Sequence, residues 1–303
     1  MESFKQGFSI FLEEGDPEAF LSLGNDGLDN LSQISLYEYS CITQKHLLAL
    51  IKSLFLKSPD LNSPNPYFAG QFLTHIATKA PEKFFDKEIL QESLGFLDNY
   101  DINPTSCGYF YQFLKPIISR KNKILKDFFL DTKSIEVLSQ NLMSSSIAEL
   151  VKDLIYNYYE TCDDLLTNLL QMAIGMNQDT ATICIEILVN CIPTINICLL
   201  NRVFTIPWLS KLVTSEAKYG KYSLMIVCEI LKLPRETQAT NLAVKIVSDN
   251  ISNLCDLLGS EISNENKIII INAIGLSLKL NLGTIQIDVG KSRFVKLSSV
   301  RDI

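Results

Sequence analysis

The chain has 303 residues, 47% of them hydrophobic and 20% charged, with a formal net charge of -7. This apolar content excludes a wholly disordered protein. The acidic balance argues against a general nucleic-acid binder, because phosphate contacts need clustered Lys and Arg. The chain has 13 Gly and 10 Pro, about 4% and about 3% of its residues, against the usual ~7% and ~5%. Few Gly and Pro residues favour helices over a turn-rich all-β fold.

The first sixty residues predict a less regular helical region. The start, Met1 to Lys5, lacks the basic segment and apolar run of a secretory signal. Six acids then occur without a Lys or Arg among them: Glu13, Glu14, Asp16, Glu18, Asp26 and Asp29. Polar, Gly- and Pro-containing stretches at 25–30 and 62–66 predict loops.

Helix starts then recur at a nearly regular spacing. Asn65-Pro66 and Asn103-Pro104 place a capping residue before a Pro at the first helical position. Ser144, Asp179 and Asn264 are further candidate caps, and Tyr219-Gly220 marks another junction. Starts near 66, 104, 144, 179, 219 and 264 match the roughly 40-residue units of armadillo and HEAT repeats.

The segments after these starts carry amphipathic stripes at helical spacing. The two clearest stripes are Ile147, Leu150, Val151, Leu154, Ile155 and Tyr158, and then Ala181, Cys184, Ile185, Leu188, Val189 and Ile192. Shorter stripes start at Leu224 and Ile270. In residues 284–289 polar and apolar side chains alternate, as they do in a strand. A lone strand has no partner to pair with, so we expect an extended tail there.

We therefore expect an all-α protein, one domain over residues 1–303. Its units would stack into a right-handed superhelical solenoid of the armadillo/HEAT type, with residues 1–60 as the less regular N-terminal part. Two long uncharged runs, 61–78 and 187–201, are too polar or too short to cross a membrane. We expect no membrane span.

The residues for catalysis or metal binding are sparse. His46 and His75 are the two histidines, and no metal-ligand spacing links them. The eight cysteines form no CxxC pair, and the seven-residue spacing of Cys184, Cys191 and Cys198 is interrupted by Pro193. We expect no catalytic, cofactor or metal site, and a reducing compartment, the cytoplasm or the nucleus.

A basic cluster without acids among its members follows the second Asn-Pro: Lys115, Arg120, Lys121, Lys123 and Lys126. It predicts either a solvated helix surface or, together with the acidic N-terminal segment, a pair of docking patches for other proteins.

Residues 65–155 resemble a known family in the order and spacing of several blocks. The blocks are Asn65-Pro66-Tyr67-Phe68-Ala69, Leu94-Gly95-Phe96-Leu97-Asp98-Asn99, Ile102-Asn103-Pro104, Gly108-Tyr109-Phe110, Ile117-Ile118, Ser119-Arg120-Lys121 and the helix from Ser144 to Val151. They are similar to the SAPS-domain family, the regulatory subunits of the protein phosphatase 6 catalytic subunit. Asn141-Leu142-Met143 stands where that family has His-Ile-Gly, and the family's domain normally continues further.

The resemblance implies a non-catalytic helical-repeat scaffold that binds a Ser/Thr phosphatase and directs its activity, with ankyrin-repeat proteins as third subunits. We predict that the turn and the basic cluster share one docking face, formed by Phe96, Leu97, Asp98, Asn99, Asn103, Pro104, Arg120 and Lys121. Two alternatives stay open at this point. One is a helical-repeat adaptor for transport or the cytoskeleton, and the other is an α-helical enzyme with an unrecognised site.

Overall fold

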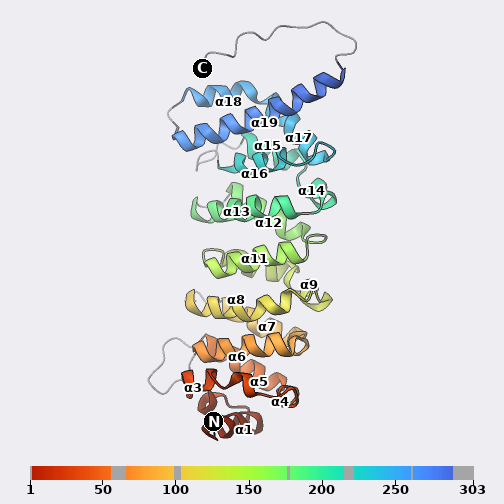
Figure 1. The fold of residues 1–303 in the computed structure, drawn as a ribbon. Helices are drawn as coiled ribbons and strands as arrows, with labels where there is room; N and C mark the ends of the chain where they lie inside the picture. The colour runs from red at the N-terminus through yellow and green to blue at the C-terminus, as the bar shows by residue number, and fades with distance from the viewer. Residues whose placement is uncertain are drawn as a thin grey trace.

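The computed structural model describes residues 2–55, 66–98, 104–175, 178–214, 222–260 and 262–288; for Asn25 and residues 282–288 it describes the backbone alone. Within these ranges the regular elements are all helices, and no strand occurs. The helices stack into a column with α1 (Glu2–Glu14) at one end and α19 (Asn264–Asp288) at the other (Figure 1). The expected all-α, helical-repeat class is confirmed.

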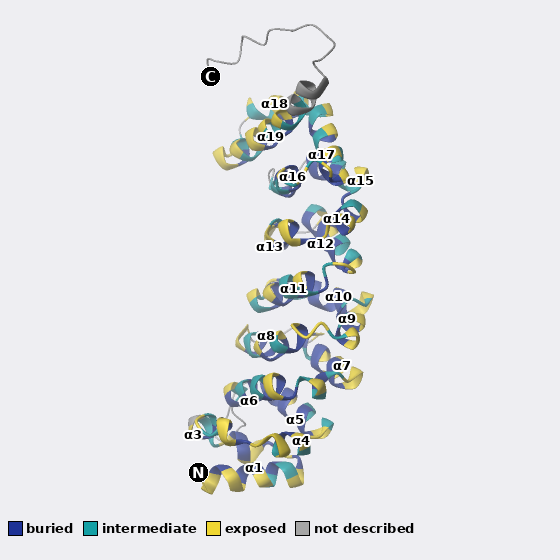
Figure 2. Cartoon of the chain, turned by 45° about the vertical axis from the view of Figure 1, so that its right-hand side comes forward, coloured by how far each residue is buried: buried dark blue, intermediate teal, exposed yellow. Residues whose placement is uncertain are grey.

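Six helices lie one above another along one side of the column, and we call them the ladder helices (Figures 1 and 2). They are α6 (Pro66–Lys79), α8 (Pro104–Ile118), α11 (Ser145–Asn157), α13 (Gln178–Cys191), α16 (Ser223–Leu231) and α19. Each packs against the next one. The starts predicted near 66, 104, 144, 179 and 264 agree to within one residue, whereas the junction predicted at 219 lies outside the described residues.

A second set of helices supports the ladder from the other side. It consists of α5 (Gln44–Leu54), α7 (Lys87–Gly95), α9 (Lys123–Phe129), α10 (Thr132–Gln140), α12 (Asp163–Gly175), α14 (Ile197–Val203), α15 (Ile206–Thr214) and α17 (Gln238–Asp249). The helix α18 (Ile251–Leu258) follows α17 and packs against α19 at the end of the column. Short helices complete the N-terminal end and the turns: α2 (Glu18–Leu21), α3 (Gly24–Leu28), α4 (Leu36–Cys41), η1 (Leu31–Gln33), η2 (Pro81–Phe84), η3 (Phe96–Asp98) and η4 (Ile192–Thr194).

Side-chain caps define where many of these helices begin. Asp86 accepts from the backbone N–H groups of Glu88 and Ile89, and Asn122 accepts from that of Ile124. Such caps satisfy donors that the first turn of a helix leaves unpaired. The chain can therefore reverse direction within a few residues at each end of a repeat.

The core runs between the two layers from one end of the column to the other (Figure 2). The stripe predicted on 147–158 is buried along its whole length. At the N-terminal end the core is mainly aromatic. Six buried phenylalanines contact one another there: Phe4, Phe8, Phe11, Phe20, Phe68 and Phe72.

The extended tail predicted for residues 284–289 is wrong over its first five residues. Residues 284–288 continue α19, and Val289 lies outside the described residues. A helix satisfies its backbone hydrogen bonds within its own segment, whereas a strand needs a neighbouring strand. No described residue supplies such a strand, so the alternation of side chains did not decide the conformation.

Candidate protein-binding surfaces

The turn that the sequence singled out is largely structural in its first part. Phe96 stacks on Phe55 with ring centroids 4.8 Å apart, and Leu97 is buried. The carbonyl of Leu97 accepts a hydrogen bond from the Asn141 side chain at 3.0 Å, which ties the turn to the end of α10. Asp98 lines a hollow of about 260 Å³ between α7 and α10. Asn99 and Asn103 lie outside the described residues.

The basic cluster forms a corner of the column where α8 meets α9. We call Arg120, Lys121, Lys123 and Lys126 the basic corner. Lys121 has φ 52, the left-handed conformation that commonly ends a helix, and its ammonium lies 5.7 Å from the centroid of the Tyr159 ring. Asn122, the next residue, caps the start of α9, so the chain reversal between α8 and α9 is fixed both where α8 ends and where α9 begins.

The basic corner borders a hollow of about 300 Å³. Its lining residues are Lys121, Lys126, Asn157, Tyr158, Tyr159, Glu160 and Thr161. Tyr158 lines the hollow with a buried side chain, and burial raises the pKa of its phenol to about 12. A hollow with two ammonium groups and one carboxylate in its lining favours an acidic side chain or segment of a partner.

The structure separates the two halves of the predicted docking face. Pro104 is the first residue of α8, and Arg120 and Lys121 follow its last residue. A helix of 15 residues is about 22 Å long. The turn and Arg120-Lys121 are therefore separated along α8, and their membership of one docking face stays a prediction. The turn and the basic corner lie at opposite edges of the ladder.

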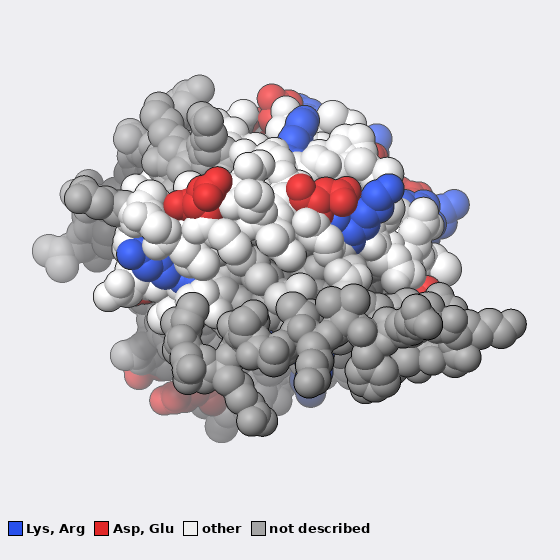
Figure 3. Space-filling view, turned by 90° about the horizontal axis from the view of Figure 1, so that it is seen from above, with Lys and Arg blue, Asp and Glu red and all other residues white. Residues whose placement is uncertain are grey.

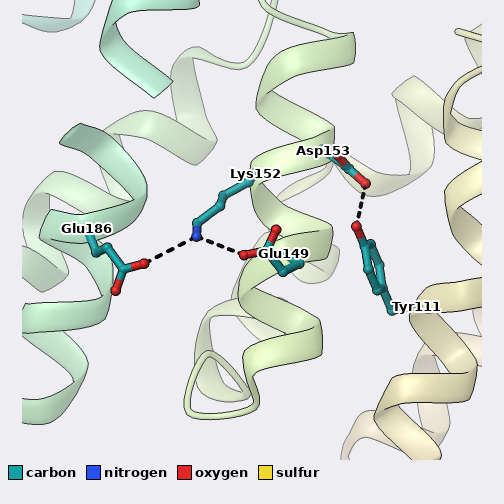
Figure 4. Close-up of polar contacts among 5 residues, drawn as sticks. All are labelled: Tyr111, Glu149, Lys152, Asp153 and Glu186. Carbon is teal, nitrogen blue, oxygen red and sulfur yellow. Dashed lines mark hydrogen bonds and ion pairs between the residues drawn. The ribbon is translucent and has the colours of Figure 1, made fainter. Parts of the chain in front are cut away.

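Between these edges, polar side chains connect successive ladder helices. The Tyr111 hydroxyl of α8 donates to Asp153 Oδ2 of α11 at 2.9 Å (Figure 4). From α11, Lys152 Nζ contacts Glu149 Oε1 at 2.9 Å and Glu186 Oε1 of α13 at 3.4 Å (Figure 4). We call these five residues the ladder face.

The surroundings of the ladder face shift two pKa values. Burial, and then the hydrogen bond to Asp153, raise the pKa of the Tyr111 phenol. Burial works against the charge of Lys152, but the carboxylates of Glu149 and Glu186 outweigh it and raise the pKa of the ammonium. Lys152 therefore remains charged while it lies between two helices.

The ladder face also borders a hollow of about 160 Å³ between α11 and α13. Met143 lines it with a side chain that is 60% exposed, and Glu149, Lys152 and Glu186 contribute charges. A flexible apolar side chain beside fixed charges is common on surfaces that bind other proteins.

The ladder face is not apparent in the sequence, because its residues are not adjacent in the chain. Tyr111 and Asp153 are 42 residues apart, and Lys152 and Glu186 are 34 apart. These separations are close to the length of one repeat. Comparison of polar residues at equivalent positions in successive repeats could have identified both pairs.

We predict that Tyr111→Phe lowers the free energy of unfolding by about 1 kcal/mol at pH 7, because the variant loses a hydrogen bond to a carboxylate. The folded protein raises the pKa of this phenol, so its contribution is complete below pH 10 and declines as the pH rises above that value. The difference between wild type and variant should therefore shrink above pH 10 in urea titrations. Tyr156→Phe is the control, since Tyr156 is 60% exposed; an equal effect there would contradict the prediction.

The two histidines hold structural positions. His46 Nδ1 accepts from the backbone N–H of Thr43 at the start of α5, and burial lowers its pKa. His75 stacks on Tyr39 at 5.7 Å, and burial lowers its pKa too. In the described part of the chain, no three His, Cys, Asp or Glu residues converge as metal ligands would. No described helix has the length and apolar character that crossing a bilayer requires.

The comparisons with known proteins give little beyond this geometry. No protein-family model matches the chain, and no curated protein matches its sequence. One similar solved structure is an engineered protein from the Northeast Structural Genomics Consortium, with a TM-score of 0.45 at 15% identity over 95% of this chain and 71% of the other. A second engineered protein from that consortium gives a TM-score of 0.33 at 12% identity over 92% and 98%. These TM-scores are too low to bear on the function of this chain.

Proposed function

We propose that this chain is a non-catalytic scaffold that binds other proteins along its ladder helices. The observation that carries the proposal is the ladder itself. Six consecutive repeats place their helices on one side of the column, so side chains far apart in the sequence form one extended surface. The column would be a right-handed superhelix of the armadillo/HEAT type, which presents such a surface to a partner.

The partner that we propose is a Ser/Thr phosphatase catalytic subunit of the protein phosphatase 6 type, and the chain would direct its activity. The support is the resemblance of residues 65–155 to SAPS-domain regulatory subunits. The resembling blocks at 66–69, 108–110, 117–118 and 145–151 fall on the neighbouring ladder helices α6, α8 and α11, and the block at 94–98 falls on α7 and η3. An ankyrin-repeat protein would be a third subunit, and the complex would act in the cytoplasm or the nucleus.

The mechanism would be positioning rather than chemistry. Charges at the rim of an interface steer the encounter and set orientation, while buried apolar anchors contribute most of the affinity. In this scheme the basic corner attracts an acidic region of the phosphatase. The exposed Met143 and the hollow beside it would accept an apolar anchor.

We predict that Arg120→Glu with Lys121→Glu weakens binding of the phosphatase catalytic subunit about tenfold, mainly through a slower association rate. The effect should be larger at low ionic strength, because salt screens exposed charges. Surface plasmon resonance at two salt concentrations measures both effects. Lys211→Glu with Lys245→Glu, on α15 and α17, changes the net charge equally and should leave binding unchanged.

Two results would contradict the proposal at different levels. Unchanged binding by the folded double variant would remove the basic corner from the interface but leave the phosphatase as partner. Affinity purification of the wild-type protein with mass spectrometry tests the partner itself. Recovery of transport or cytoskeletal proteins without a phosphatase would favour the alternative, a helical-repeat adaptor unrelated to phosphatases.

A further inference from the structure

The two ends of the column differ in chemical character. At the N-terminal end, α1 directs Phe4, Phe8 and Phe11 into the core. Its outer surface is formed by exposed residues that are mostly charged or polar: Glu2, Ser3, Lys5, Gln6, Ser9, Glu13 and Glu14. A polar outer face is what the terminal unit of a repeat array needs in order to face water.

At the other end, α19 is apolar on two opposite faces. Ile270 and Ala273 are fully buried against the column. On the opposite side, Ile268 is 58%, Ile271 56% and Leu278 44% exposed. Successive residues of a helix are rotated by about 100°, which places these three residues on one stripe. A helix that is apolar on both faces is normally covered on both.

Seen from above, the described surface of this end of the column is mostly uncharged, with a few separated acidic and basic side chains (Figure 3). The exposed stripe has the spacing of a coiled-coil seam. Ile268, Ile271, Gly275 and Leu278 are separated by three, four and three residues, as the apolar positions of a heptad are. Gly275 is exposed, and apart from the neighbouring backbone of α19 no atom of the described residues lies within 4 Å of the position that a Cβ would take. A second helix can therefore approach α19 closely at its middle.

The charges beside the stripe indicate what covers it. Glu265 and Lys279 are exposed and lie on the same flank of the stripe, one near each end. If a second α19 packs antiparallel, Ile268 lies opposite Leu278 and Ile271 lies opposite Gly275. The same register brings Glu265 of each copy near Lys279 of the other, which gives two pairs of opposite charge. The Glu265 carboxylate also accepts from the Tyr222 hydroxyl at 3.0 Å, which orients it.

We propose that two copies of this chain associate through α19, antiparallel and related by a two-fold axis. The outer face of α1 is mostly charged or polar, so a head-to-tail contact between α19 and α1 would bury little apolar surface. The apolar stripe of α19 therefore meets the same stripe of a second copy, as in most homodimers. One helix face buries less than the ~1,200 Å² of a stable interface. We therefore expect a dissociation constant of the dimer on the order of 10 µM.

Sedimentation equilibrium of the full chain between 1 and 300 µM tests the proposal. The wild type should shift from monomer to dimer over this range, and Ile271→Asp should weaken association at least tenfold. Tyr156→Asp on α11 is the matched control, an equally exposed residue away from the seam, and should behave as wild type. Wild-type protein that stays monomeric throughout, or Ile271→Asp protein that dimerises as wild type does, would overturn the proposal.

A charge exchange tests the antiparallel register. Glu265→Lys and Lys279→Glu should each weaken the dimer roughly threefold to tenfold at low salt, because each places like charges together twice. The double variant should regain wild-type association, and a mixture of the two single variants should form a mixed dimer. Failure of both the double variant and the mixture to recover association would refute the register. Circular dichroism confirms that each variant is folded.

Discussion

Phe20→Ala should lower the free energy of unfolding of the N-terminal repeats by about 3–5 kcal/mol, the usual range for deleting a buried phenyl ring. Phe20 is fully buried and lies at the centre of the aromatic cluster. Its ring centroid is 5.0 Å from that of Phe68 and 5.1 Å from that of Phe72, and it also contacts Phe4, Phe8 and Phe11. Alanine would leave a cavity among five rings that belong to two helices, α1 and α6.

The loss should be local, because each unit of a repeat column contacts mainly its neighbours. Hydrogen exchange with mass spectrometry should show faster exchange in α1, α2 and α6 and little change in α16 and α17. Tyr156→Ala removes an aromatic ring that is 60% exposed and should change stability by less than about 0.5 kcal/mol. Uniform loss of protection along the whole chain would contradict the local effect.

Gly70→Ala should destabilise the protein by about 2 kcal/mol, although alanine is the better helix former by about 1 kcal/mol. Gly70 is buried in α6, where α6 packs against α8. A Cβ there would lie 2.7 Å from the Tyr109 Cβ and 2.9 Å from its Cγ. A side-chain rotation cannot move the Tyr109 Cβ, so the two helices must separate.

Gly108→Ala in the neighbouring ladder helix, α8, is the matched control, and it should stabilise the protein where Gly70→Ala destabilises it. Its Cβ would lie 3.7 Å from Ser146 Oγ, an ordinary contact, so the helix-propensity gain of up to about 1 kcal/mol remains. Chemical denaturation of both variants measures the contrast. Two changes of the same sign would show that close packing between α6 and α8 does not decide the effect.

The order of the helices could be predicted because its causes are local. The stripe on 147–158 has helical spacing, and Ser144 and Pro104 stand at helix starts that the structure confirms. The tail at 284–288 could not be predicted this way. Its alternating side chains favour a strand, but a strand also depends on a partner elsewhere in the fold, and the described residues contain none.

The candidate site was less predictable than the fold. Arg120, Lys121 and Asp98 are exposed, as a docking role would require, but Leu97 is buried and Phe96 packs on Phe55. A single sequence does not distinguish a turn that binds a partner from a turn that packs into the core. Both need the same apolar and capping residues.

The sequence by itself determined that the chain is helical, repeated roughly every 40 residues and apolar along one stripe of each helix. These properties depend on side chains within one or two turns of each other. The tertiary structure decided that Pro104 and Lys121 lie at opposite edges, that Tyr111 reaches Asp153, and that α19 exposes a second apolar stripe. Those outcomes depend on how one repeat is rotated and shifted against the next. That geometry is set by packing between layers, where residues some 40 positions apart meet.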